Sequence, residues 1–390
     1  MRAPNASRSL KRPYTAHILL AEYSRPSAGR TPDASHRAGR LARVQPLAEL
    51  TTLRLGGPPR RYLEGADEAS IVAAVRGADA AGEPLLVLAG GSNLVVADDG
   101  FPGTVLRIAS RGIEDHGGGR LSVQAGEPWD PFVARTVGAG LAGLECLSGI
   151  PGTVGATPIQ NVGAYGQEVA ETIVSVRVLD RRSGAVEELP AEACGFAYRS
   201  SRFKRTPGRW VVLAVTFALV PAPRSAPIRY AELARALGVA EGATAPLPDV
   251  RGAVLGLRRS KGMVLDAGDP DSVSAGSFFM NPVLDAAAFA ALERRARERL
   301  GPDARVPRFP QPDGTVKTSA AWLIERAGFT RGHGDPAAIA ISSKHTLALT
   351  NRGAGTTASL IALAREIAAG VREAFGVELT PEPVFVGHAW

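Results

Sequence analysis

The sequence predicts an α+β fold with more than one hydrophobic core. Its 390 residues exceed the usual size of a single domain, and 45% of them are apolar, which is enough for several packed cores. From Val44 onward, helical and strand patterns alternate along the chain. No apolar run approaches the roughly 18 residues of a membrane span, and the stretch 17–23 is too short and too interrupted for a signal-peptide core. We therefore expect a globular cytoplasmic protein.

The individual elements follow from the periodicity of the apolar residues. Residues 67–82 place Ile71, Val72 and Val75 on one helical face, with Asp67 as the cap, and the apolar run 85–89 predicts a buried strand. Residues 172–180 and 185–189 flank an Arg-Arg-Ser-Gly turn and predict a hairpin, and residues 210–219 predict a further strand. Residues 356–376 predict a long amphipathic helix near the end of the chain.

The net charge of +7 is confined to the first 43 residues. That segment holds nine Lys and Arg residues against two acidic residues, Glu22 and Asp33, so residues 44–390 are neutral overall. It is also rich in Pro, Ser and Ala and has no sustained periodicity, which predicts a disordered basic tail. Contact with nucleic acid is one interpretation; a dispensable extension or a start placed too far upstream is preferred, and no nucleic-acid partner is expected.

The cysteines and histidines predict neither disulfides nor a metal site. Cys146 and Cys194 are the only cysteines and have no metal-ligand spacing, so we expect reduced, buried thiols. The six histidines are scattered along the chain. A serine hydrolase is also disfavoured, because Ser277 stands in Ala-Gly-Ser-Phe-Phe rather than in a Gly-x-Ser-x-Gly elbow.

Three glycine-rich stretches raise the question of a bound dinucleotide. Residues 138–143 match Gly-x-Gly-x-x-Gly, but the residues before them have helical rather than strand character, so a helix C-terminus is the better interpretation. Residues 90–93, Gly-Gly-Ser-Asn, follow an apolar strand and can form an anion-binding nest, although the motif taken alone is better interpreted as an ordinary turn. Residues 149–166 contain five glycines and little charge, which suggests backbone packed against a large, flat ligand rather than a buried irregular loop.

Seven ordered motifs together resemble one enzyme family. They span residues 51–57, 88–96, 143–168, 194–204, 275–282, 311–329 and 379–387. In this order they are similar to the UDP-N-acetylenolpyruvoylglucosamine reductase family, over about residues 45–387. The presence of Tyr230 in Pro-Ile-Arg-Tyr-Ala-Glu-Leu places the chain with the subtype that has a tyrosine loop.

The resemblance implies a fold and a division of the chain. The fold is a two-part FAD-binding unit of the vanillyl-alcohol-oxidase type followed by a C-terminal α+β substrate domain. The expected segments are the tail 1–43, FAD-binding subdomains 44–106 and 107–262, a substrate domain 263–378, and a C-terminal strand 379–390 that returns to the active site. We expect a monomer.

The resemblance also implies a reaction and three catalytic residues. FAD, held without a covalent bond, would take hydride from NADPH and pass it to the terminal carbon of an enolpyruvyl ether on a UDP-sugar. Ser277 would then protonate the adjacent carbon, with Gly276 allowing close approach. Arg199 would meet the substrate carboxylate with its planar fork, and Glu382 would help to stabilise the intermediate. Without the resemblance, Ser277 would be interpreted as a strand hydroxyl, Arg199 as a surface charge and Glu382 as an exposed acid at a sheet edge.

Binding residues carry over from the same resemblance. Substrate contacts are expected from Tyr230, Lys261, Asn281 and Gln311, with Arg258 and Arg259 as possible helpers of Lys261; a solvated charge run and turn-forming roles are the competing interpretations. For FAD the expected residues are Gly90, Gly91, Ser92, Asn93, Gly155, Ala156, Ile159, Gly163 and Tyr165. Ala156 departs from the serine that some members have, so backbone contacts would replace one side-chain contact. The alternative activity is an FAD-dependent oxidase of the same broad fold that uses oxygen.

Overall fold

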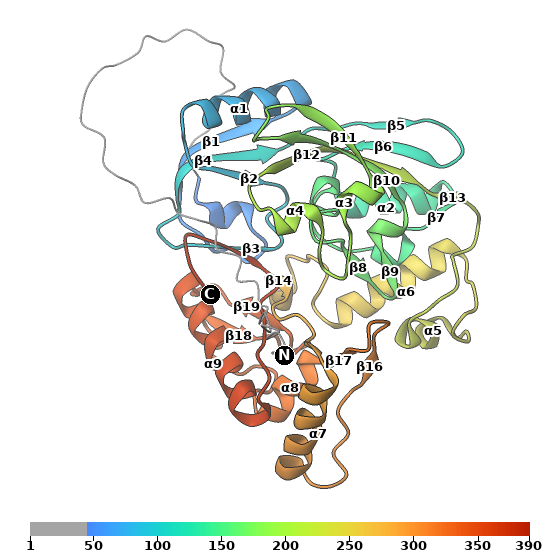
Figure 1. The fold of residues 1–390 in the computed structure, drawn as a ribbon, viewed down its shortest axis with the longest axis vertical. Coiled ribbons are helices and arrows are strands. Elements are labelled where there is room, and N and C mark those ends of the chain that lie inside the picture. Colours follow the sequence, from blue (N-terminus) through green and yellow to red (C-terminus); the bar gives the residue numbers. More distant parts are fainter. Residues whose placement is uncertain (1–44) are drawn as a thin grey trace, which may run out of the picture.

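The computed structural model describes residues 45–390, and its first unit is a small parallel sheet (Figure 1). Helix α1 packs on this sheet and is capped by Asp67, whose carboxylate accepts a hydrogen bond from Ser70 N at 2.7 Å. Ile71 and Val75 are fully buried, so the predicted helix and its apolar face are confirmed. The strand order is β1-β4-β2. The elements are β1 (Pro59–Gly65), α1 (Glu68–Ala80), β2 (Leu85–Leu88) and β4 (Phe101–Ile108).

A larger antiparallel sheet follows, with the order β11-β10-β12-β6-β5. The predicted hairpin is confirmed as β10 and β11, which pair with Val176 opposite Leu189, and the predicted strand at 210–219 is β12. Helix α2 packs its rings against this sheet, with the centroids of Phe132 and Phe217 5.4 Å apart. The elements are β5 (Ile113–Asp115), β6 (Arg120–Gln124), α2 (Trp129–Gly138), β10 (Ile173–Asp180), β11 (Val186–Pro190) and β12 (Trp210–Ala218).

Several short elements fill the space beside this sheet. Helices α5 and α6 enclose a small core of their own around Leu233, Val250 and Val254. The remaining elements here are β7 (Leu141–Ala142), β8 (Gly163–Ala164), β9 (Gln167–Glu168), α3 (Ala191–Cys194), α4 (Arg202–Arg205), β13 (Val220–Pro221), α5 (Ala231–Leu237) and α6 (Leu247–Ser260).

The C-terminal part has a separate core, built around a three-stranded sheet of order β14-β19-β18 and three helices. Helix α9 buries the apolar face predicted for it, including Leu360, Ile367 and Phe375. The elements are β14 (Ser274–Ser277), β15 (Val283–Leu284), α7 (Ala286–Leu300), β16 (Phe309–Pro310), β17 (Val316–Lys317), α8 (Ala320–Ala327), β18 (Ile339–Ile341), β19 (Ala348–Asn351) and α9 (Thr357–Phe375). Figure 1 shows this part below the two N-terminal sheets.

The end of the chain returns to the N-terminal part at the boundary between these parts. Strand β20 (Val384–Val386) pairs in parallel with β3 (Leu94–Val96), which directly follows the first glycine loop. The Asn351 side chain donates to the carbonyl of Leu53 at 3.0 Å. Asp98 accepts hydrogen bonds from the first two backbone amides of α9, those of Thr357 at 2.8 Å and Ala358 at 3.0 Å. The C-terminal part is therefore held against the N-terminal part by polar contacts as well as by packing. The predicted basic tail lies outside the described residues.

Candidate active site

The two predicted glycine loops lie directly against each other. A Cβ atom on Gly90 would stand 2.6 Å from the Cα of Gly152, which leaves room only for glycine. Ser92 Oγ donates to the carbonyl of Pro151 at 3.2 Å, so the Gly-Gly-Ser-Asn loop is hydrogen-bonded to the longer loop. Gly91 has φ of +60°, a conformation that favours glycine. Residues from two distant motifs thus form one backbone-lined surface.

The longer glycine loop is held in shape by Asn161. This residue is buried, has φ of +46°, and its amide donates to Glu168 Oε2 at 2.6 Å and to the carbonyl of Ala197 at 3.2 Å. Beside it, the apolar side chain of Ile159 is 39% exposed. Ala156 ends a 3-10 turn, and Gly163 begins β8. A rigid loop that presents bare backbone and an exposed aliphatic side chain suits a flat aromatic ligand.

Arg258 supplies a buried cation next to this loop. The Nε of Arg258 is buried and makes no hydrogen bond within residues 45–390, and a Cβ on Gly149 would lie 3.4 Å from it. Its Nη2 donates to the carbonyl of Met263 at 2.7 Å. Burial lowers the pKa of Arg258, and the nearby Arg199 lowers it further. Arg258 therefore places a buried positive charge beside the longer glycine loop, and the two glycine loops fit FAD.

Arg199 and Glu382 form an ion pair in the same region. Arg199 Nε lies 3.5 Å from Glu382 Oε1, and the two side chains are 25% and 12% exposed. Arg199 has φ of +50°, in the left-handed region, so its backbone is held by its surroundings. The interpretation of these residues as an exposed acid and an isolated surface charge is wrong.

Ser277 and Glu382 lie on neighbouring backbone segments. Glu382 N donates to the carbonyl of Phe278 at 2.8 Å, and Asn93 Nδ2 lies 3.4 Å from the carbonyl oxygen of Glu382. The first glycine loop, the strand that carries Ser277 and the returning C-terminal segment therefore meet. Gly276 has φ of +76°, and a Cβ there would contact nothing within 4 Å. Backbone conformation, rather than crowding within the chain, is the structural reason for this glycine.

The expected substrate residues divide into two groups. Tyr230, which is 42% exposed, stands edge-on to Tyr165 with 5.5 Å between ring centroids. Lys261 Nζ lies 2.7 Å from Glu232 Oε2 and 5.9 Å from the ring centre of Tyr165. Tyr230 and Lys261 therefore lie beside Tyr165, which is part of the longer glycine loop.

Asn281 and Gln311 already have partners within the chain. Asn281 Oδ1 accepts from Ala320 N at 3.0 Å, at the start of α8. Gln311 Nε2 donates to the carbonyls of Phe309 and Pro310 at 2.9 and 3.1 Å, in an exposed turn. Among the described contacts, none joins Gln311 to Ser277, Arg199 or Glu382.

Residue-by-residue reasoning from the sequence missed Lys204. It lies in α4, five positions after Arg199, and burial lowers the pKa of its ammonium. Glu382 and Arg199 are the charged groups that act on it. The sequence held one signal, because Lys204 ends the same motif as Arg199, but nothing in that motif shows which way the side chain points.

Other predicted features have structural rather than chemical roles. The Gly-x-Gly-x-x-Gly stretch follows helix α2, and Gly140 has φ of +69°, so the helix-terminus interpretation is confirmed. Both cysteines are buried, and burial raises the pKa of Cys146 to about 12 and that of Cys194 to about 11. Residues 45–390 contain no cluster of three potential metal ligands, and no helix among them is long and apolar enough to cross a membrane.

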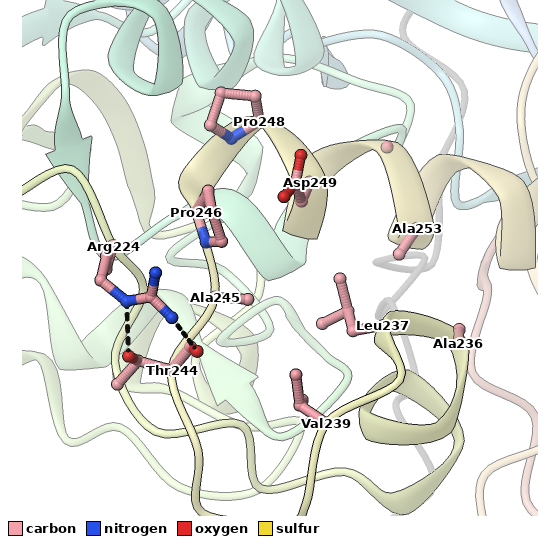
Figure 2. Close-up of a pocket in the computed structure, with 11 residues that line it drawn as sticks. Arg224, Ala236, Leu237, Val239, Thr244, Ala245, Pro246, Pro248, Asp249 and Ala253 are labelled. Atoms are coloured by element: carbon pink, nitrogen blue, oxygen red, sulfur yellow. Dashed lines mark hydrogen bonds between the residues drawn. The ribbon is translucent and has the colours of Figure 1, made fainter.

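A hollow of about 640 Å³ opens between α5 and α6, and neither residue of the ion pair lines it (Figure 2). Figure 2 shows Leu237, Val239 and Ala253 along it, with Arg224 at one side. The Arg224 guanidinium is already bonded to Thr244 Oγ1 at 2.9 Å and to the Thr244 carbonyl at 2.5 Å. No unpaired polar group of the site described above faces this hollow, so it contributes nothing to the chemistry.

Comparison with known proteins decides the family. A family model described as UDP-N-acetylenolpyruvoylglucosamine reductase, C-terminal domain, matches residues 269–386, and one described as FAD binding domain matches residues 59–189. The UDP-N-acetylenolpyruvoylglucosamine reductase of Thermobifida fusca is 57% identical over 351 residues, which cover 89% of this chain and 98% of that protein. The chain belongs to the UDP-N-acetylenolpyruvoylglucosamine reductase family.

Further comparisons agree with the reductase family. The protein of the same name from Streptomyces coelicolor is 59% identical over 345 residues, covering 88% of this chain and 90% of that protein. The crystal structure of UDP-N-acetylenolpyruvylglucosamine reductase from Thermus caldophilus aligns with a TM-score of 0.60 and 25% identity, over 88% of this chain and 99% of that one. The predicted family, the FAD-binding fold with its C-terminal α+β unit, and the FAD cofactor are confirmed, and the chain is an oxidoreductase.

Proposed function

We propose that this protein uses NADPH and FAD to reduce UDP-N-acetylglucosamine enolpyruvate to UDP-N-acetylmuramate, a step of peptidoglycan precursor synthesis, in the cytoplasm. The observation that carries the proposal is the Arg199–Glu382 pair, 3.5 Å apart, beside the backbone of the Ser277 strand and between the glycine loops and the C-terminal part. Family membership gives the substrate class, since the relatives bear this enzyme's name.

The cofactor and the site residues have separate tasks. FAD would be held by the two glycine loops, with the buried cation Arg258 beside them, and when bound it would accept hydride and then donate it. The net reaction consumes the enolpyruvyl ether, NADPH and one proton, and yields the lactyl ether and NADP⁺. The chain itself must bind a carboxylate, tolerate a second negative charge beside it, and deliver that proton.

Arg199, Glu382 and Ser277 fit these tasks. The Arg199 guanidinium is partly buried and can bind the substrate carboxylate while it remains paired with Glu382. Hydride on the terminal carbon leaves negative charge on the adjacent carbon and the carboxylate. Ser277 Oγ–H donates its proton to that carbon, and the serine oxygen then takes a proton from solvent. Tyr230 and Lys261, next to Tyr165, would contact the diphosphate of the nucleotide.

The test uses the purified full-length protein. We expect a yellow protein that releases FAD on denaturation and that oxidises NADPH over many turnovers only when UDP-N-acetylglucosamine enolpyruvate is present. Mass spectrometry should show a product two mass units heavier than the substrate. A colourless protein that cannot be reconstituted with FAD contradicts the proposal.

The reaction of the reduced flavin with oxygen distinguishes the proposed reductase from the alternative, an FAD oxidase. Under the proposal, the NADPH-reduced protein should be reoxidised much faster by the enolpyruvyl compound than by air. Rapid reoxidation by air, with hydrogen peroxide formed and no effect of the enolpyruvyl compound, would instead indicate an oxidase. Gel filtration with light scattering would test the expectation of a monomer.

A further inference from the structure

Lys204 is a half-buried cation that the chain leaves without a direct partner. Within residues 45–390 its ammonium makes no hydrogen bond and no ion pair closer than 4 Å. Removing an ammonium from water without a partner costs free energy, so such groups are normally paired or exposed. The surroundings of Lys204 therefore suggest an anion that is not part of the chain.

The position of Lys204 is fixed by the cofactor loop. Its backbone amide donates to Ser201 Oγ at 3.2 Å, and the same Oγ donates to the carbonyl of Ile159 at 2.5 Å. Ser201 is fully buried, and Phe203 is 5% exposed and anchors α4 in the core. The helix that carries Lys204 is thus tied to the loop that presents Ile159 to the cofactor.

The charges around Lys204 do not balance. Its charged neighbours are Glu382 and Arg199, and these two already form the ion pair at 3.5 Å. One carboxylate beside two cations leaves a local charge of about +1. A site with this excess is complementary to an anion, and more so to one whose charge grows during the reaction.

We propose that Lys204 is a further catalytic residue, whose ammonium contacts the carboxylate of the enolpyruvyl group together with Arg199. This inference rests on the proposed function. The substrate carboxylate brings one negative charge, which the excess cation neutralises. Hydride addition brings a second, shared by the carboxylate and the adjacent carbon until Ser277 protonates that carbon. Lys204 then stabilises this doubly charged state more than the ground state.

The test compares Lys204→Met with Arg202→Met. Arg202 lies on the same short helix, but its guanidinium stands 5.8 Å from the ring centre of Trp210. Arg202→Met therefore removes a cation of α4 that is not among the charged neighbours of Lys204. Both variants should keep bound FAD and be reduced by NADPH within about threefold of the wild-type rate. Reoxidation by the enolpyruvyl substrate should slow by about 10²-fold or more in Lys204→Met, as for loss of one donor to a developing charge, and should be unchanged in Arg202→Met.

The relative affinity for two nucleotide ligands, one with and one without the carboxylate, gives a readout that a purely structural role of Lys204 would not change. UDP-N-acetylmuramate carries the lactyl carboxylate, whereas UDP-N-acetylglucosamine lacks it. Titrations followed by the flavin absorbance should show binding of the first weakened about tenfold or more in Lys204→Met, which corresponds to one charged hydrogen bond, and binding of the second changed less than twofold. Lys204→Arg should recover part of the loss, because it restores the charge.

Failure of this inference differs from failure of the proposed function. If wild-type protein neither reduces the enolpyruvyl compound nor binds UDP-N-acetylmuramate, the proposed function is wrong. If wild-type protein does both and Lys204→Met matches it, only the role of Lys204 is overturned. Equal weakening of both nucleotide ligands, or equal slowing of both half-reactions, would also overturn it, because the lysine would then act through the fold or the flavin.

Discussion

The hydroxyl of Thr52 donates to the carbonyl of Ser274 at 2.7 Å and so ties the start of the folded chain to the strand that ends at Ser277. The backbone N–H of Thr52 also donates to the carbonyl of Gly91, in the first glycine loop, at 3.2 Å. The cofactor loop and the strand of the proposed proton donor are therefore joined through one residue. The distance between the first glycine loop and the Ser277 strand is therefore set by the two hydrogen bonds of Thr52 as well as by the packing of the N-terminal and C-terminal parts.

The role of Ser277 can be separated from a structural one by measuring the two half-reactions. In Ser277→Ala, flavin bleaching by NADPH should be nearly unchanged. Reoxidation by the enolpyruvyl substrate should slow by about 10²-fold to 10⁴-fold, the usual worth of general acid catalysis. Ser277→Cys should recover part of the rate, since a thiol also donates a proton. Loss of flavin, or equal slowing of both steps, would show that the hydroxyl only shapes the site.

The Arg199–Glu382 pair should behave as one unit. Arg199→Met leaves the partly buried carboxylate of Glu382 without its partner, and we expect kcat/KM to fall by about 10²-fold to 10³-fold, the range for breaking a desolvated charged contact. Arg199→Lys should recover little, because an ammonium cannot reproduce the planar fork. In the double variant with Glu382→Gln, the losses should be less than additive. Additive losses would mean that the 3.5 Å contact carries no coupling.

Asp98 should contribute to the stability of the contact between the two parts. Its carboxylate accepts from two amides at the start of α9, so Asp98→Ala should lower the free energy of unfolding by about 1–2 kcal/mol, as for loss of a helix cap. Denaturant unfolding of the holoenzyme measures this change. The neighbouring Asp99→Ala is the matched control, because the Asp99 side chain is exposed and makes no such contact. Equal effects of the two variants would contradict the assignment.

His345 predicts a pH dependence of stability. Burial lowers the pKa of His345 to about 4, with Lys261 and Arg331 adding repulsion, whereas the unfolded residue titrates near 6.5. Between pH 6.5 and about 4, His345 is protonated in the unfolded state but remains neutral in the folded state. Protonation of His345 in the unfolded state therefore lowers the free energy of unfolding as the pH falls from 6.5 toward 4, whereas above pH 6.5 this loss is absent. The melting temperature of wild-type protein should fall more between pH 7.5 and 5 than that of His345→Gln; identical pH dependence would contradict the shift.

The basic segment 1–43 should be dispensable for catalysis. It holds the whole net charge of the chain, and all seven motifs of the reductase family lie after it. A chain that starts at Val44 should therefore keep the FAD content and kcat/KM of the full-length protein within about twofold. Steady-state kinetics and the flavin-to-protein absorbance ratio measure this. Loss of FAD on truncation would mean that the segment supports the cofactor site.

The sequence by itself determined several of the helices and strands and pointed to most of the residues that we propose for the chemistry, apart from Lys204. Helix α1, with its Asp67 cap, and helix α9 could be predicted because a 3.6-residue apolar period and a capping side chain are local properties. The β10–β11 hairpin followed from its turn. The glycine loops and the motifs around Arg199, Ser277 and Glu382 were recognisable because their residues are contiguous in the chain.

Only the tertiary structure decided which of these residues meet. Arg199 and Lys204 lie in one short segment, whereas Glu382 comes from the end of the chain, and the parallel pairing of β20 with β3 brings Glu382 beside the first glycine loop. The partners of Asn281 and Gln311, and the unpaired Nε of Arg258, also depend on packing. The physical reason is that a side chain's burial and charge partners are set by segments far from it in sequence, whereas periodicity and turn chemistry act only between near neighbours.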